Sequence, residues 1–119
     1  MGKASRDKGK RGEREVAELL RDHGIPARRG VQYAGGHDAP DVVGFDGVHI
    51  EVKRAETLRL YPALEQALAD RRPGDIATVW HRPSGRPWAV IMLAADFIAL
   101  MRALGPTNPA TRSARGEPS

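Results

Sequence analysis

Residues 40–53 hold two acids and a lysine at a spacing that could bring them together. The segment reads Pro-Asp-Val-Val-Gly-Phe-Asp-Gly-Val-His-Ile-Glu-Val-Lys. In its second half, apolar residues alternate with His49, Glu51 and Lys53, which therefore share one face of an expected β-strand. Two carboxylates beside a lysine indicate a divalent-metal site with a basic group next to it, an arrangement that suits phosphodiester chemistry.

The turn of this expected hairpin decides whether its two acids meet. A two-residue loop would turn Asp41 and Glu51 to opposite faces of the sheet. A three-residue loop that ends in a left-handed Gly47 instead places Asp41 opposite Glu51 and Val42 opposite Ile50. Because the second register also collects the apolar side chains on one face, we predict the three-residue loop.

Two adjacent carboxylates repel each other and are stabilised by a cation between them. Oxygen ligands in a chain without cysteine favour Mg²⁺, with Mn²⁺ as a substitute, over Zn²⁺. The backbone carbonyl of Val52 could supply a further ligand. Lys53 could orient or deprotonate an attacking water, or neutralise charge on the phosphate. A glutamate and a lysine two residues apart are also common on solvent-facing strands. Pro40-Asp41 on the preceding strand is what favours a metal site over an ordinary charged surface strand.

Glu13 adds a third acid from an expected helix over residues 11–23. At helical spacing it falls beside Val16, Ala17 and Leu20 rather than among the charged residues of the other face. A carboxylate on an apolar face is costly without a partner, so Glu13 could close the metal site from the helix side. The alternative is an exposed first-turn glutamate favoured by the helix dipole.

The elements that must hold these residues follow from periodicity and from glycine and proline breaks. We expect a flexible basic arm over residues 1–10, a single domain over residues 11–104 and a disordered tail over residues 105–119. After the first helix the expected elements are strands at 25–32, 41–44 and 48–53, a helix near 60–71, strands at 76–81 and 87–93, and a helix at 95–104. Their order, α-β-β-β-α-β-β-α, indicates an α/β fold.

Composition restricts the class of protein. The 119 residues suffice for one core, and the hydrophobic content of 40% and charged content of 29% are those of a globular chain. No apolar run could span a bilayer and the first residues are not signal-like, so we expect a cytoplasmic protein with no membrane partner. The net charge of +4 favours an anionic partner. Arginine outnumbers lysine, which suits nucleic acid but also suits a GC-rich genome.

The order and context of these residues resemble the PD-(D/E)XK nuclease superfamily. The superfamily motif is matched by Glu13, Pro40-Asp41 and Glu51-Val52-Lys53, on helix, strand and strand. A narrower resemblance, over residues 8–104, is to archaeal-type Holliday junction resolvases, which have phage-encoded relatives of similar size. It is carried by the basic arm before Gly12-Glu13-Arg14-Glu15, by Arg28-Arg29 and by the Gly-rich loop before Pro40.

The resemblance implies a restriction-endonuclease-like core with a central mixed five-stranded sheet flanked by helices. It implies a Mg²⁺-dependent endonuclease that needs no nucleotide cofactor, and a homodimer that cuts four-way DNA junctions symmetrically in a prokaryotic or phage-infected cell. In this chain Glu13, Asp41 and Glu51 match the metal-binding acids and Lys53 matches the catalytic lysine. Gln66 matches an accessory position.

Basic residues near the expected site could hold DNA through its phosphates, which gives affinity without sequence readout. The candidates are Lys8, Lys10, Arg11, Arg14, Arg28, Arg29 and Arg54. Their alternative role is solubility. Two other functions remain open for the chain as a whole. One is a nuclease for flaps, branched DNA or nicking within the same superfamily, and the other is a non-catalytic basic DNA-binding module.

Overall fold

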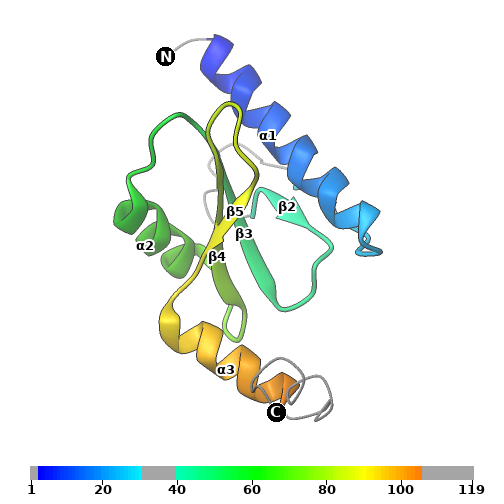
Figure 1. The fold of residues 1–119 in the computed structure, drawn as a ribbon, viewed down its shortest axis with the longest axis vertical. Helices are drawn as coiled ribbons and strands as arrows, with labels where there is room; N and C mark the ends of the chain where they lie inside the picture. Colours follow the sequence, from blue (N-terminus) through cyan, green and yellow to red (C-terminus); the bar gives the residue numbers. More distant parts are fainter. Residues whose placement is uncertain (1–2, 31–39, 106–119) are drawn as a thin grey trace, which may run out of the picture.

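The computed structural model of the chain describes residues 3–30 and 40–105. Figure 1 shows the elements in the order that the sequence predicts. They are α1 (Lys3–Asp22), β1 (Arg28–Arg29), β2 (Val42–Val43), β3 (Val48–Arg54), α2 (Leu60–Asp70), β4 (Ile76–Arg82), β5 (Ala89–Ile91) and α3 (Ala94–Leu104).

The strands form one five-stranded mixed sheet in the order β1-β2-β3-β4-β5. Every neighbouring pair is antiparallel except β3 and β4, which run parallel. Parallel strands need a long crossover connection, and α2 supplies it. The predicted α/β fold with a mixed five-stranded sheet is therefore confirmed.

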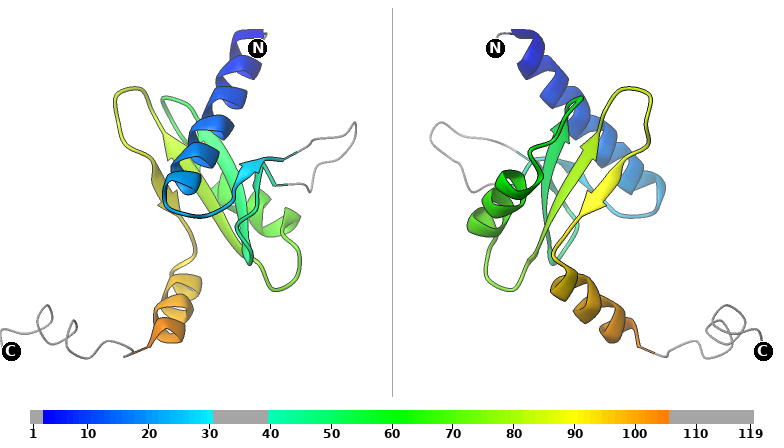
Figure 2. Two further views of the ribbon diagram at one scale, coloured as in Figure 1. Left: turned by 90° about the vertical axis from the view of Figure 1, so that its right-hand side faces the viewer. Right: turned by 60° about the vertical axis from the view of Figure 1, so that its left-hand side comes forward.

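The two faces of the sheet are covered by different helices (Figure 2). On one face α1 packs Val16, Ala17 and Leu20 against Ile50 and Val52. On the other face α2 forms a smaller core, made of Ala63, Leu64, Ala67, Ala77 and Val79. Because side chains alternate along β3, Ile50, Val52 and Arg54 face α1, whereas His49, Glu51 and Lys53 face the side of α2.

The turn between β2 and β3 has the predicted register. Val42 pairs with Ile50, and the backbone N–H of Asp41 donates to the carbonyl of Ile50 at 2.9 Å. Gly47 has a φ of 82°, in the left-handed region that glycine adopts without strain. The three-residue loop is confirmed, and this register carries Asp41 to the position opposite Glu51.

The first helix is longer than predicted. Residues 3–10, expected as part of a flexible arm, are helical and continuous with the rest of α1. The polar, basic and glycine-containing composition of this segment suggested flexibility, but a glycine inside a helix costs only about 1 kcal/mol relative to alanine, which the rest of the helix can offset. The expected loop at 33–39 and most of the expected tail lie outside the described residues. No helix in the described part of the chain is both long and apolar enough to cross a membrane.

Candidate functional site

Asp41 lies at the centre of a group of charged side chains. Its Oδ2 accepts a hydrogen bond of 2.8 Å from the backbone N–H of Val52, which ties the carboxylate to β3. Burial raises the pKa of Asp41 to about 7, and the negative charges of Glu51 and then Glu13 add to the rise. The Val52 hydrogen bond and the charge of Lys53 act in the opposite direction. Glu13, Glu51 and Lys53, the other residues predicted for the site, are thus close enough for their charges to act on Asp41.

Glu51 is buried, with 6% of its surface exposed, and it has a specific partner. Its Oε1 lies 2.9 Å from Nε2 of His49, which is also buried, with 2% exposed. We expected His49 to be an ordinary strand residue. A local signal existed, because residues two apart on a strand share a face and His49 precedes Glu51 by two.

Glu13 reaches this group from α1. Its Oε1 accepts a hydrogen bond of 3.0 Å from Nε of Arg29 on β1, and the two form an ion pair. The glutamate is partly buried and lies well inside the helix, since α1 begins at Lys3. The alternative of a first-turn glutamate favoured by the helix dipole is therefore excluded.

Lys53 and Gln66 line one small cavity of about 210 Å³ between the end of β3 and the start of α2. Across the sheet Lys53 pairs in register with His81, whose Nε2 lies 2.9 Å from the carbonyl oxygen of Ala55. This contact fixes the chain just after the Glu51-Val52-Lys53 motif. Gln66 thus lies on the same cavity as the lysine.

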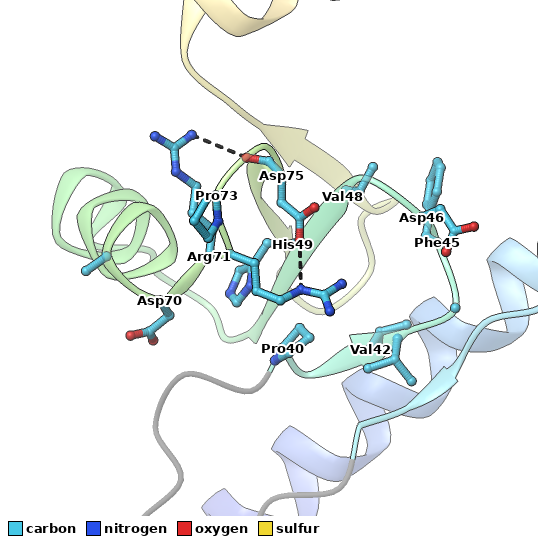
Figure 3. A pocket seen from close by; sticks show the side chains of 14 residues that line it. Pro40, Val42, Phe45, Asp46, Val48, His49, Asp70, Arg71, Pro73 and Asp75 are labelled. Atoms are coloured by element: carbon cyan, nitrogen blue, oxygen red, sulfur yellow. Dashed lines mark hydrogen bonds and ion pairs between the residues drawn. The ribbon is translucent and has the colours of Figure 1, made fainter.

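A larger open cavity of about 730 Å³ is lined by His49, the partner of Glu51 (Figure 3). It lies between the β2–β3 hairpin and the end of α2, and its walls include Pro40, the neighbour of Asp41, and His49. Arg71 and Arg72 at its edge both contact Asp75, at 3.3 Å and 3.5 Å. The candidate acids do not line it, so it is a space beside the site rather than the site itself.

The oxygen atoms of the candidate acids are chemically suited to bind a hard divalent cation. All side-chain candidates are carboxylate oxygens, the ligands that Mg²⁺ prefers. The pKa of Asp41 is raised first by burial and then by the negative charge of Glu51, a repulsion that a cation would relieve. Within residues 3–30 and 40–105, however, no three His, Asp or Glu side chains converge closely enough to form a metal site. Glu13 and Glu51 are instead held by Arg29 and His49.

The basic residues expected to bind DNA fall into two groups. Exposed positions on α1 and β1 are occupied by Lys10, Arg11, Arg14 and Arg28. The others are engaged with acids: Lys8 lies 3.7 Å from Glu56, and Arg29 pairs with Glu13. The residues of the first group are therefore the ones whose side chains are accessible to DNA.

Arg54 differs from the other expected DNA contacts. Its side chain is only 10% exposed, its Nε lies 3.8 Å from Glu15, and its Nη1 donates to the carbonyl of Arg82. The reason is alternation along β3, which turns Arg54 toward α1 together with Val52. Arg54 therefore packs between elements, and a DNA contact is not supported for it.

Glu15 has a structural role that periodicity along α1 did not reveal. Its Oε1 accepts hydrogen bonds from Nη1 of Arg82 at 2.7 Å and from Nε1 of Trp88 at 3.1 Å. Both partners are distant in sequence, so no local pattern could have indicated them. The contacts join α1 to the far end of the sheet and help to fix the helix that carries Glu13.

Comparisons with known proteins agree with this geometry. The family described as archaeal Holliday junction resolvase (hjc) matches residues 4–93, a segment that contains every candidate acid, Lys53 and Gln66. Among solved structures, the chain is similar to Hjc from Archaeoglobus fulgidus, described as a Holliday junction resolvase from an archaeal hyperthermophile. The two are 29% identical, with a TM-score of 0.54, over 71% of this chain and 72% of the other. Comparison with curated proteins gives no significant match.

The family model matches the chain over most of its length. The chain therefore belongs to the archaeal Holliday junction resolvase family, within the PD-(D/E)XK nuclease superfamily.

Proposed function

We propose that the protein is a Mg²⁺-dependent, structure-selective DNA endonuclease that resolves four-way junctions by symmetric cuts. The observation that supports this most directly is Asp41, whose pKa is raised to about 7 by burial and by two further acids, beside a lysine. Perturbed carboxylates gathered beside a lysine are typical of catalytic sites. Membership of a resolvase family gives the group its substrate class.

The proposed site divides its tasks among residues from three elements. Glu13, Asp41 and Glu51 would hold the cation, with the backbone carbonyl of Val52 as a further ligand. When bound, Mg²⁺ would polarise the phosphate and lower the pKa of a bound water. Lys53 orients or deprotonates the attacking water, or neutralises charge on the phosphate, and Gln66 on the same small cavity positions the lysine.

The exposed cations of α1 and β1 would hold the DNA backbone. Lys10, Arg11, Arg14 and Arg28 are exposed, and Glu13 and Arg29 on the same two elements lie at the candidate site. Contacts with phosphates fix register without reading bases, which suits an enzyme that recognises the shape of a junction. We propose that it acts in the cytoplasm of a prokaryotic or phage-infected cell.

A second copy of the chain would complete the enzyme, because symmetric cleavage of a junction needs two active sites. The surface that favours a homodimer is α3, which extends away from the sheet and has no buried residue (Figure 1). Its exposed large apolar residues are Phe97, Ile98, Leu100, Met101 and Leu104, and they continue from Val90 on the edge strand β5. An apolar surface of this kind marks an interaction site.

Cleavage of labelled DNA tests the proposal. Four-way junctions, flaps and linear duplexes are incubated with the protein with and without Mg²⁺, and Asp41→Asn serves as the inactive control. We expect paired cuts in junctions that need both Mg²⁺ and Asp41. Equal rates on linear duplex would remove the resolvase assignment, and preferred cutting of flaps would favour the related flap nuclease. Binding without cutting would favour a non-catalytic DNA-binding module.

A further inference from the structure

We propose that His49 is a positioning residue for the metal-binding carboxylate of Glu51. The inference rests on the proposed function in one respect, namely that Glu51 binds the divalent cation. It concerns a residue outside the superfamily motif. What distinguishes His49 is a buried, direct contact with one member of that motif.

The contact has a defined direction. Nε2 of His49 lies 2.9 Å from Oε1 of Glu51, and both side chains are almost fully buried. A carboxylate can only accept hydrogen bonds, so the pairing places the hydrogen on Nε2 of the imidazole. The bond occupies one carboxylate oxygen and leaves the other as the oxygen that can serve a cation.

The backbone that carries the imidazole is held in place. The backbone carbonyl of His49 accepts a hydrogen bond of 2.8 Å from the hydroxyl of Thr78, which in turn accepts one of 2.9 Å from Nε1 of Trp80. His49 also pairs in register with Ala77 in the parallel β3–β4 ladder. The backbone of His49 is thus fixed at the centre of the sheet and its ring is almost fully buried, whereas a glutamate side chain alone would rotate about three bonds.

The position of the pair favours a role in metal binding over simple burial of a polar group. Asp41 lies opposite Glu51 in the hairpin register, and the charge of Glu51 acts on it. His49 contacts Glu51 from two residues back along the strand and lines the cavity toward the end of α2 (Figure 3). Partners that orient a metal-binding side chain typically change metal affinity by about 10–100-fold when they are removed.

The test compares two substitutions that differ in the hydrogen-bond donor. His49→Gln retains an N–H at a similar distance along the side chain, and His49→Leu fills the space without a donor. Binding of Mn²⁺ to the protein without DNA is measured by electron paramagnetic resonance. We expect His49→Leu to weaken Mn²⁺ binding by about 10-fold or more, and His49→Gln to stay within about 3-fold of the unsubstituted protein.

Leu64→Ala is the matched control, because Leu64 is a buried residue of the core on the same face of the sheet. It lowers stability without removing the donor, so Mn²⁺ binding should be unchanged at temperatures where all variants are folded. Mn²⁺ binding by His49→Leu equal to that of the unsubstituted protein would overturn the inference. So would a loss in His49→Gln or Leu64→Ala as large as that in His49→Leu.

The proposed function can fail separately. If the unsubstituted protein binds Mn²⁺ but cuts no DNA, the endonuclease proposal is lost while the affinity comparison still decides the role of His49. If junctions are cut and all variants bind Mn²⁺ equally, only the positioning role is lost.

Discussion

The carboxyl group of Asp41 makes folding dependent on pH. Its pKa is about 7 in the folded chain, chiefly through burial and then through repulsion by Glu51, against 3.8 for an ordinary aspartate. Between about pH 4 and pH 7 the folded chain therefore keeps a proton that the unfolded chain has lost. The stability contributed by this proton is present at low pH and is lost as the pH rises through 7.

Asp41→Asn removes this titration. We expect the variant to be more stable than the unsubstituted protein above pH 7, by roughly 1–4 kcal/mol, since each pKa unit corresponds to about 1.4 kcal/mol. Its stability should also change less between pH 5 and 8. Urea unfolding at several pH values, with a chelator present, measures the difference. Asp22→Asn, at an exposed position of α1, should follow the unsubstituted protein. Parallel curves for Asp41→Asn and the unsubstituted protein would contradict the expectation.

The placement of α1 on the sheet depends on one glycine. A Cβ at Gly12 would lie 2.7 Å from Cβ of Arg54 and 3.2 Å from Cγ1 of Val52, whereas a Cβ at Gly9 would have no neighbour within 4 Å. In Gly12→Ala the overpacking, which costs about 1–3 kcal/mol, exceeds the helix-propensity gain of about 0.5–1 kcal/mol. In Gly9→Ala only the gain remains.

The two alanine substitutions should therefore change the free energy of unfolding in opposite directions. Gly12→Ala should also reduce cleavage, because the adjacent Glu13 moves with the helix, and Gly9→Ala should leave cleavage unchanged. Chemical denaturation and the junction assay measure the two effects. If both variants were stabilised by the same amount, close packing at Gly12 would not be a constraint.

Local sequence patterns predicted those features of the structure that depend on neighbouring residues. They did not predict features that depend on contacts between residues far apart in the sequence. The hairpin register follows from alternation and one left-handed glycine, so the opposition of Asp41 and Glu51 was predictable. The start of α1 was not predictable, because Gly9 suggests flexibility in a polar, basic segment and no local pattern shows that Gly12 packs against β3. The contacts of Glu15 were not predictable either, because its partners Arg82 and Trp88 are distant in the sequence.

At the scale of the whole molecule, α3 is the surface that we propose for self-association. Ile98 is 56% exposed within the apolar surface of α3, and Tyr61 on α2 is 69% exposed outside it. If a second copy covers α3, Ile98→Glu buries a charge in the interface, which is unfavourable without a partner. Tyr61→Glu adds the same charge to a surface that we expect to remain in solvent.

We expect Ile98→Glu to weaken self-association by about 10-fold or more, since a 1.4 kcal/mol change already has that effect. Tyr61→Glu should leave association unchanged. Sedimentation velocity over a range of protein concentrations measures both variants against the unsubstituted chain.

A monomeric Ile98→Glu protein should still cut single strands of a junction, because the candidate acids and Lys53 all lie in one chain. The two cuts in one junction should, however, no longer be made together. An unsubstituted protein that is monomeric at all concentrations, or paired cuts made by a monomeric variant, would contradict a role of α3 in a homodimer.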